Sequence, residues 1–547
     1  MNNSYGSRFI WTYVLLLTSG LCSYSQGLIG VNDYVRDYVR ILEIQGAEIL
    51  NPLIINYNQT AVWGVDTTKT HSSNLWSERL SHYSEIDQPG LSVYLISPQL
   101  GYVYSSKYSR PYNDGPVWTG RGSTFEINAG LKVKWGPLTG ISYPNFYYSQ
   151  NKPFKRQSPG ETNLNPRQNE LNYQLSNQID WVQLFGYDSF TDFNLGQSSI
   201  SLELGPTLVK FGTENIWWGP AVLNPVMMSN TAPGFPHLTL GTAKPLQSKF
   251  GDFELYSFWG QLKESQYFDD NPLNDERLIT GLSLGYRPSF AEDLKGVSLG
   301  LGRIIYKAWP ASGISPNDIL LGFSKIGPNF EQDESGEILY NEADQYISFD
   351  FRWFLEESGV EFYFEWVQND AWLESQDVLY TLGFQKLHRV DNATWRLGFE
   401  QTSLAATRTR ENAKDIYAHP LVTQGYTNQG NLLGAPIGPG SKSQFIRLDR
   451  FDRSGKFGFS INRIRFNDNF FFARYNDFTR HDVEWNFRLE AVRFFKDYEI
   501  SAQFIYSRRM NWHYYHNLDV NNFQVLTSFK WHFIDKPIFS TKSTSIR

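Results

Sequence analysis

Cysteine is almost absent from this sequence, since Cys22 is the only one among 547 residues. A chain with one cysteine cannot form an intramolecular disulfide, so its stability must come from packing and backbone pairing. Beyond residue 26 the sequence also lacks any apolar stretch of about 18 residues, the length that a membrane-spanning helix needs. A membrane location would therefore require strands.

The sequence also lacks an excess of basic residues over acidic ones. The net charge is −7 and the pI is near 5.8, whereas a nucleic-acid binder needs a concentrated basic surface that neutralises phosphates. We therefore expect no nucleic-acid partner.

Catalytic signatures are lacking too. The nine histidines are scattered, and neither H-E-x-x-H, G-x-S-x-G nor a phosphate-binding glycine loop occurs in the required setting. The acid pairs Asp269-Asp270 and Glu356-Glu357 could serve glycosidase chemistry, but adjacent loop acids are more typical of a solvated surface. We expect no enzyme activity, no metal and no cofactor.

The N-terminus has the features of an export signal. Arg8 precedes an apolar run at 9–17, and the small residues Ser23 and Ser25 follow at the spacing of a cleavage site. We expect a signal peptide at 1–25, cleaved after Ser25.

Cys22 lies within this segment and could instead mark a lipoprotein anchor. Leu21 disfavours that alternative, because a small residue usually precedes the anchored cysteine. Cleavage after Ser25 would leave a mature chain without cysteine.

Aromatic residues are abundant, with 17 Trp, 32 Tyr and 40 Phe, although the mean hydropathy is −0.42. A membrane barrel places such rings in two interfacial belts. A soluble all-β glycan-binding protein could show the same excess, so composition alone favours the barrel only modestly.

Residues 26–115 are predicted to form a small helical plug or periplasmic module. Apolar residues recur there at helical spacing, with charged residues between them: Val31, Tyr34, Val35, Tyr38, Val39, Ile41 and Leu42. A second helical piece is expected between Ser72 and Tyr83.

Residues 116–540 are predicted to form an outer-membrane β-barrel. Apolar and polar residues alternate with a period of two at 125–135, 347–355, 395–399, 485–491 and 525–533. A soluble sandwich or propeller would show the same alternation. The ionic residues on the opposite face suit a hydrated lumen, and Trp135, Trp353, Trp366 and Trp531 suit interfacial belts.

The predicted fold class is therefore an all-β antiparallel transmembrane barrel with a small N-terminal helical module. About 420 residues, divided into tilted strands of ~9–11 residues with turns and loops, give roughly 16 to 18 strands. Gly- and Pro-rich stretches at 153–166, 310–316, 326–336 and 425–441 are interpreted as long, mostly extracellular loops.

Two segments carry a resemblance to a known family. The first reads Glu-Asn-Ile-Trp-Trp-Gly-Pro at 214–220, followed by Ser229-Asn230 and Phe235-Pro236. This order of rare residues resembles the hallmark of the Wzi capsule-assembly family. The chain departs from that pattern at Ile216, where the family often has Gln, and at Pro233-Gly234, where it often has Arg.

The second segment begins at Tyr417-Ala418-His419-Pro420 and continues through 425–441. It is similar to the late His- and Gly-rich segment of the same family. The helical pattern at 32–46 also looks like the family's helical start.

The resemblance implies a non-enzymatic, lectin-like barrel that retains capsular or extracellular polysaccharide at the surface of the outer membrane. Its expected partners are that polysaccharide, outer-membrane lipid and other envelope proteins. The residues that it singles out for glycan binding are Asn215, Trp217, Trp218, Gly219, Pro220, Ser229, Asn230, Phe235, Tyr417, His419, Tyr426 and Asn428.

Physical chemistry leaves alternatives open. Trp and Tyr rings can stack on the apolar faces of sugars, yet the same Trp pair could be buried in a loop that folds into the lumen. The barrel could also be a porin or solute channel, a scaffold in another surface or secretion machine, or a barrel-embedded hydrolase.

Overall fold

The structure is a computed structural model that describes residues 25–26, 34–46, 55–57, 74–80, 90–157, 170–173, 179–324, 330–332, 338–340, 343–369, 379–405, 416–475, 477–532 and 538–540. The expected signal peptide lies outside the described residues except for Ser25. Within the described ranges, no helix has the length and apolar character needed to cross a membrane.

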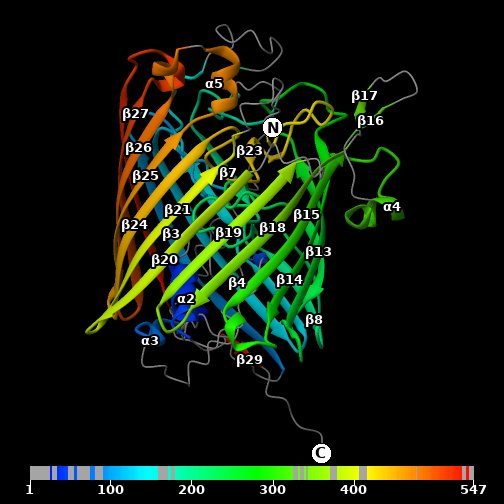
Figure 1. Cartoon of the computed structure of the whole chain (residues 1–547), viewed down its shortest axis with the longest axis vertical. Coiled ribbons are helices and arrows are strands. Elements are labelled where there is room, and N and C mark those ends of the chain that lie inside the picture. The colour runs from blue at the N-terminus through cyan, green and yellow to red at the C-terminus, as the bar shows by residue number, and fades with distance from the viewer. Residues whose placement is uncertain are drawn as a thin grey trace, which may run out of the picture.

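A closed antiparallel β-barrel dominates the described part of the chain (Figure 1). Its strands occupy 18 positions among the described residues, because β5 and β6, β7 and β8, and β11 and β12 each share one position. Pairing of β28 with β3 closes the ring. The predicted fold class is thus confirmed.

The wall strands are β3 (Leu91–Ser105), β4 (Gly122–Trp135), β5 (Leu138–Ser142), β6 (Asn145–Ser149), β7 (Phe190–Asn194), β8 (Ser199–Leu204), β9 (Thr207–Gly212), β11 (His237–Thr242), β12 (Leu246–Ser248), β13 (Gly251–Lys263), β14 (Glu276–Pro288), β15 (Val297–Ala308), β18 (Ala343–Leu355), β19 (Val360–Asn369), β20 (Leu379–Val390), β21 (Ala393–Ser403), β24 (Lys442–Asp452), β25 (Gly455–Arg465), β26 (Val483–Phe494), β27 (Tyr498–Met510) and β28 (Val520–Trp531).

Smaller strands are β1 (Ser25–Gln26), β2 (Ile55–Tyr57), β10 (Ile216–Trp218), β16 (Phe330–Gln332), β17 (Ile338–Tyr340), β22 (Thr427–Asn428), β23 (Asn431–Leu432) and β29 (Phe539–Ser540). The helices are α2 (Tyr34–Ile44), α3 (Ser77–Leu80), α4 (Pro316–Ile319) and α5 (Asp468–Arg474), with single 3-10 turns η3 (Glu292–Leu294), η4 (Leu321–Phe323), η5 (Phe478–Arg480) and η6 (Trp512–Tyr514).

The period-two alternation decides which face of each strand is lipid-facing. In β4, Phe125, Ile127 and Trp135 are exposed on the outside, whereas Thr124 and Lys132 are buried on the inside. A strand alternates its side chains between faces, so an apolar set on one side and a polar set on the other produce a lipid-facing wall around a polar lumen. The same arrangement recurs around the ring.

The two ends of the barrel differ. At one end, two-residue turns join neighbouring strands at 136–137, 205–206, 249–250, 391–392 and 453–454. At the other end, connections are longer, including 106–121, 213–236, 309–342 and 404–441. We call these the short-turn end and the long-loop end.

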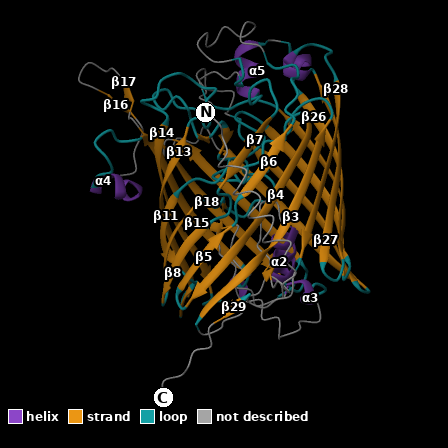
Figure 2. Ribbon diagram, turned by 180° about the vertical axis from the view of Figure 1, so that it is seen from behind, coloured by secondary structure: helices purple, strands orange, loops and turns teal. Residues whose placement is uncertain are grey.

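Helix α2 lies inside the barrel toward the short-turn end (Figures 1 and 2). Its apolar side packs with Trp76 and Leu80 against Leu387 and Phe451 of the wall. The helical pattern read from 31–42 thus corresponds to α2. The second expected piece contains only the single turn α3 within the described residues.

The barrel begins earlier than the boundary at residue 116 that the sequence suggested. Strand β3 starts at Leu91 and forms part of the wall, so the helical module cannot extend to 115. The register shifts between Ile96 and Gln99, around Ser97 and Pro98. This irregularity interrupts the period-two pattern that would have revealed the strand.

Candidate functional site

Two long connections fold back into the lumen and meet there. We call residues 213–236 the tryptophan loop and residues 416–441 the tyrosine loop. The Ser229 N–H donates to the Leu433 carbonyl at 2.7 Å, and the Ser229 hydroxyl donates to the Gly434 carbonyl at 2.6 Å. The Tyr417 hydroxyl donates to the Val226 carbonyl at 2.6 Å. The two motifs singled out from the sequence therefore form one unit.

The tryptophan pair divides between two environments. Trp218 has no solvent exposure and packs in the luminal core, with its ring centroid 6.4 Å from that of Phe258. Trp217 retains 8% exposure, and the Arg36 guanidinium lies 5.8 Å from its ring centroid. Gly219 follows with φ of 103°, a backbone conformation that favours glycine. The turn thus places only Trp217 beside open space.

Two buried carboxylates of the wall hold the tryptophan loop. Glu365 on β19 accepts the N–H groups of Ala221 at 2.7 Å and Val226 at 2.9 Å. These two hydrogen bonds tie both ends of the 221–226 stretch to β19.

Glu400 on β21 accepts three successive N–H groups of the same loop. The shortest distances are 2.7 Å to Val222, 3.1 Å to Leu223 and 2.8 Å to Asn224. The Tyr363 hydroxyl donates to the same carboxylate at 2.9 Å. The loop therefore has one defined path across the lumen.

The start of the tryptophan loop is fixed by a buried ion pair. Lys210 lies 2.5 Å from Glu214, and His237 lies 3.8 Å from the same carboxylate. Burial by itself raises the pKa of Glu214. The nearby Lys210 and His237 have the larger combined effect, so the pKa of Glu214 is lowered. Asn215 next to it donates to the Ala232 carbonyl and accepts from Gln197, both at 2.8 Å.

The tyrosine loop is equally well packed. Tyr426 is fully buried, with its ring centroid 5.7 Å from that of Tyr417. Burial raises the pKa of Tyr417 above its ordinary value, so its hydroxyl stays protonated as a donor. Asn428 donates to the Pro233 carbonyl at 3.1 Å, and His419 accepts the Val422 N–H at 3.1 Å.

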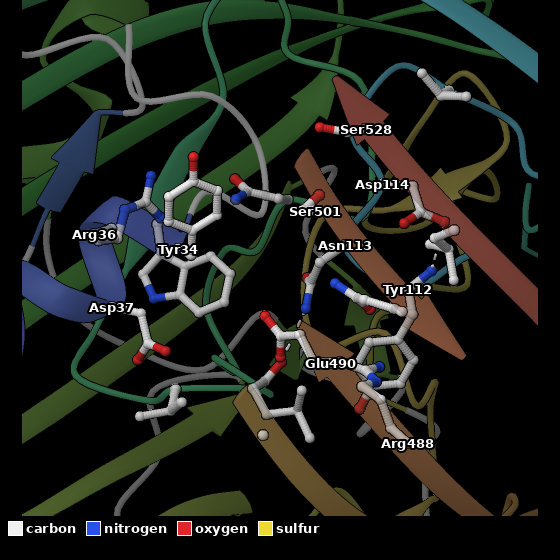
Figure 3. Close-up of a pocket in the computed structure, with 18 of the residues that line it drawn as sticks. Tyr34, Arg36, Asp37, Tyr112, Asn113, Asp114, Arg488, Glu490, Ser501 and Ser528 are labelled. Carbon is white, nitrogen blue, oxygen red and sulfur yellow. Dashed lines mark hydrogen bonds between the residues drawn. The ribbon is translucent and has the colours of Figure 1, made fainter. Parts of the chain in front are cut away.

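A cavity of about 400 Å³ remains in the lumen between α2, the tryptophan loop and the wall (Figure 3). This is a volume typical of ligand pockets. Four of the twelve predicted residues line the cavity, namely Trp217, Gly219, Pro220 and Asn230. The other eight are buried within the two loops and their contacts: Asn215, Trp218, Ser229, Phe235, Tyr417, His419, Tyr426 and Asn428.

Polar side chains from distant segments complete the lining. Figure 3 shows Tyr112, Asn113 and Asp114 of the β3–β4 connection on the same side as Arg488 and Glu490 of β26, with α2 on the other side. Burial raises the pKa of Asp114 above its ordinary value. These residues were not predicted from the sequence. The alternation at 485–491 does indicate that Arg488 and Glu490 face the lumen.

The α2 side of the cavity is held by an ion network. Arg396 binds both carboxylate oxygens of Asp37, and the Asp37–Arg447 distance is 3.0 Å. Burial disfavours the charged form of Asp37, but Arg396, Arg447 and Lys456 together hold its pKa well below the usual value.

A second anchor lies one helical turn further along α2. Arg40 lies 3.0 Å from Glu361, and Glu43 lies 2.6 Å from Arg352. Asp37, Arg40 and Glu43 therefore point to the wall and fix the helix in the lumen. In the described parts of the chain, no group of three or more His, Cys, Asp or Glu side chains could hold a metal ion.

Comparisons with known proteins agree with this architecture. The model of a family described as capsule assembly protein Wzi matches residues 110–522, more than half of the chain. Among solved structures, the chain is similar to Wzi, described as an outer membrane protein involved in group 1 capsule assembly in Escherichia coli and as a carbohydrate-binding β-barrel. The identity is 13% and the TM-score 0.59, with 93% of this chain and 100% of that chain covered.

Porins give looser likenesses. A BenF-like porin from Pseudomonas fluorescens Pf-5 has 11% identity and a TM-score of 0.39, with 80% of this chain and 98% of that chain covered. OccK2 from Pseudomonas aeruginosa has 13% identity and a TM-score of 0.39, with 81% and 99% covered. Neither likeness is close enough to bear on function. No curated protein matches the chain significantly.

Proposed function

The chain belongs to the capsule assembly protein Wzi family, and from that premise we propose that it binds capsular or extracellular polysaccharide and holds it at the cell surface without chemical change. It is an outer-membrane β-barrel of a family concerned with capsule assembly. The lectin-like, non-enzymatic mode of action is our proposal.

The observation that carries the proposal is the luminal cavity beside Trp217. Sugar rings offer apolar C–H faces to aromatic side chains and hydroxyl groups to polar ones. The cavity offers both kinds of surface, since Tyr34 and Tyr112 line it together with Asn113 and Asn230. A glycan unit in this space would meet Trp217 on the tryptophan loop.

The orientation in the membrane follows from the loops. Outer-membrane barrels place short turns in the periplasm and long loops outside the cell. On this basis the long-loop end faces the exterior, and α2 closes the periplasmic side. The tryptophan and tyrosine loops then lie between the cell surface and the cavity.

Retention of polysaccharide tests the proposal. In a strain that lacks the gene, we expect cell-associated polysaccharide to appear in the medium with unchanged chain length, and the wild-type gene to restore attachment. Trp217→Ala should restore it poorly, whereas Trp395→Ala, on the lipid-facing side of β21, should restore it fully. Unchanged retention of polysaccharide on cells of the deletion strain would contradict the proposal.

A porin or solute channel is the competing function. The wide, polar lumen permits it in principle, but α2 and the two loops occupy that lumen in the structure. In planar bilayers we expect the purified protein to be nearly silent. Stable open steps of uniform size would favour the channel instead.

A further inference from the structure

A short segment after β15 leaves the barrel and lies against its outer wall. We call residues 309–324 the flap; it contains α4 and η4. Figures 1 and 2 both show α4 outside the ring of strands, beside β13 to β15. The other long connections described above fold over or into the lumen. The flap differs from them because it contacts the outer face of the wall.

The flap covers a polar part of an otherwise apolar surface. On the lipid-facing sides of β14 and β15, Leu284 and Leu301 are exposed. Further along the same two faces stand Thr280 and Arg303, which are buried. Arg303 lies near the middle of β15, where a strand that faces lipid would be expected to carry an apolar residue.

Carbonyl groups of the flap accept hydrogen bonds from the Arg303 guanidinium. Its Nη1 donates to the carbonyls of Ser324 at 2.6 Å and Gly322 at 3.3 Å, and its Nη2 donates to Gln345 at 2.8 Å. Gly322 lies close against the wall. A Cβ atom built on this glycine would be in van der Waals contact with the Thr280 hydroxyl, at 3.6 Å. The guanidinium is thus removed from the barrel's outer surface.

Two further contacts secure the other end of the flap. Lys307 lies 2.5 Å from Asp318, and the Trp259 ring N–H donates to the Ile319 carbonyl at 2.8 Å. The Ser315 hydroxyl and the Asp318 side chain form a capping box at the start of α4. The flap is therefore docked through polar contacts on its inner side.

The exposed residues of the flap include four large apolar side chains, besides the polar Ser312 and Asn317. Ile314, Ile319, Leu320 and Phe323 have exposed fractions of 49%, 47%, 58% and 59%. A segment packed on a protein in water buries its apolar residues and exposes its polar ones. The flap has the opposite arrangement, with its polar contacts inside and its apolar side chains outside.

We propose that the flap is a membrane-embedded segment whose outer side contacts the acyl chains of lipids in the leaflet on the long-loop side. Continuity with the lipid-facing wall at Leu284 and Leu301 identifies lipid as the occupant. The flap covers the polar wall residues Thr280 and Arg303 and presents apolar side chains in their place. It thereby enlarges the apolar surface that the barrel offers to lipid on this side. The inference rests on the membrane location and not on glycan binding.

Depth-dependent quenching of a fluorophore tests this inference. Cys22→Ser removes the native thiol, and Leu320→Cys then carries an environment-sensitive label on the full-length protein in phosphatidylcholine vesicles. Leu301→Cys on the wall is the lipid-exposed reference. Leu273→Cys in the β13–β14 connection, 93% exposed, is the aqueous reference.

We expect spin-labelled lipids to quench the label at 320 as strongly as the one at 301, and aqueous iodide to quench it several-fold less than the one at 273. Strong iodide quenching at 320 would place the flap in water and overturn the inference. Protection from both quenchers would mean a protein partner, which also overturns it. Asp318→Asn, which breaks the contact with Lys307, should raise iodide quenching at 320.

Discussion

Trp217 and Trp218 are adjacent in the sequence, yet they experience different surroundings. The backbone turn at Gly219 leaves the first beside the cavity and the second within the luminal core. A sequence pattern marks both residues equally, because it records their order and not their exposure. Alanine substitutions separate the two environments.

For Trp218→Ala we expect a loss of stability of about 3–5 kcal/mol, the usual cost of deleting a large buried ring. Thermal unfolding in detergent, followed by circular dichroism, would report it as a lower midpoint. Trp217→Ala should lower the midpoint less than Trp218→Ala and should reduce recovery of polysaccharide in a pull-down. Equal effects of both variants on stability would contradict this division.

Glu400 provides a second residue-scale prediction. Glu400→Gln keeps the shape of the side chain but replaces one of the two oxygens that accept the loop N–H groups by an NH2 group, which cannot accept them. Each buried loop N–H that loses its acceptor should cost about 1–3 kcal/mol. Hydrogen–deuterium exchange at 221–226 should therefore accelerate.

Glu357→Gln in the exposed turn between β18 and β19 is the matched control and should leave exchange at 221–226 unaltered. If Glu400→Gln also leaves that exchange unaltered, the loop has another source of order.

The site could be predicted only in part from the sequence. The rare residues of the tryptophan loop stood out because they cluster locally. Glu365 and Glu400 did not, since each is one of many inward-facing acids and its role appears only when the barrel brings it to a loop far away in the chain. Alternation shows that an acid faces the lumen, but it cannot show what the acid meets there.

At the scale of elements, α2 is held both by apolar packing and by ion pairs. Asp37, Arg40 and Glu43 bind partners on six different strands, while the apolar side covers Trp76 and the wall near the short-turn end. Removing one member of a buried ion pair leaves its partners unpaired. The docking of α2 should thus depend strongly on single residues.

Asp37→Asn should loosen α2, at a cost on the order of 3 kcal/mol, visible as faster hydrogen exchange at 34–44. Asp391→Asn, in the exposed turn between β20 and β21, is the control. The stabilisation from ionised Asp37 is lost only when the pH falls to the pKa of Asp37 in the folded protein. Because that pKa lies well below its ordinary value, the stabilisation persists on mild acidification.

Wild-type exchange at 34–44, corrected for its intrinsic pH dependence, should therefore be as slow at pH 4.5 as at pH 7. A loss of protection between these values would show that another group controls the docking.

Elements with regular periods were read correctly from the sequence, as β4, β18, β21 and β26 show. Strand β3 was missed because its irregularity at Ser97 and Pro98 breaks the alternation. The stretch at 425–441 was expected to be a surface loop, yet it lies in the lumen against the tryptophan loop. Glycine and proline mark the ends of strands but not the direction in which a loop then folds.

At the scale of the whole molecule, closure depends on the seam between β28 and β3. Thr527 pairs there with Tyr102 and, on its other side, with Ala502 of β27. Thr527→Pro removes a backbone donor and introduces a ring into a central strand. We expect loss of the folded form on unheated SDS gels, whereas Thr527→Val should keep it. A folded band for the proline variant would show that the seam tolerates a break.

The meeting of the tryptophan and tyrosine loops has a consequence for biogenesis. Their contacts join segments that leave the wall after β9 and after β21, so the luminal core cannot form until most of the sheet exists. Pairings between such distant segments form slowly. Weakening them should first lower the amount of protein that reaches the membrane, before any change in what the finished barrel binds.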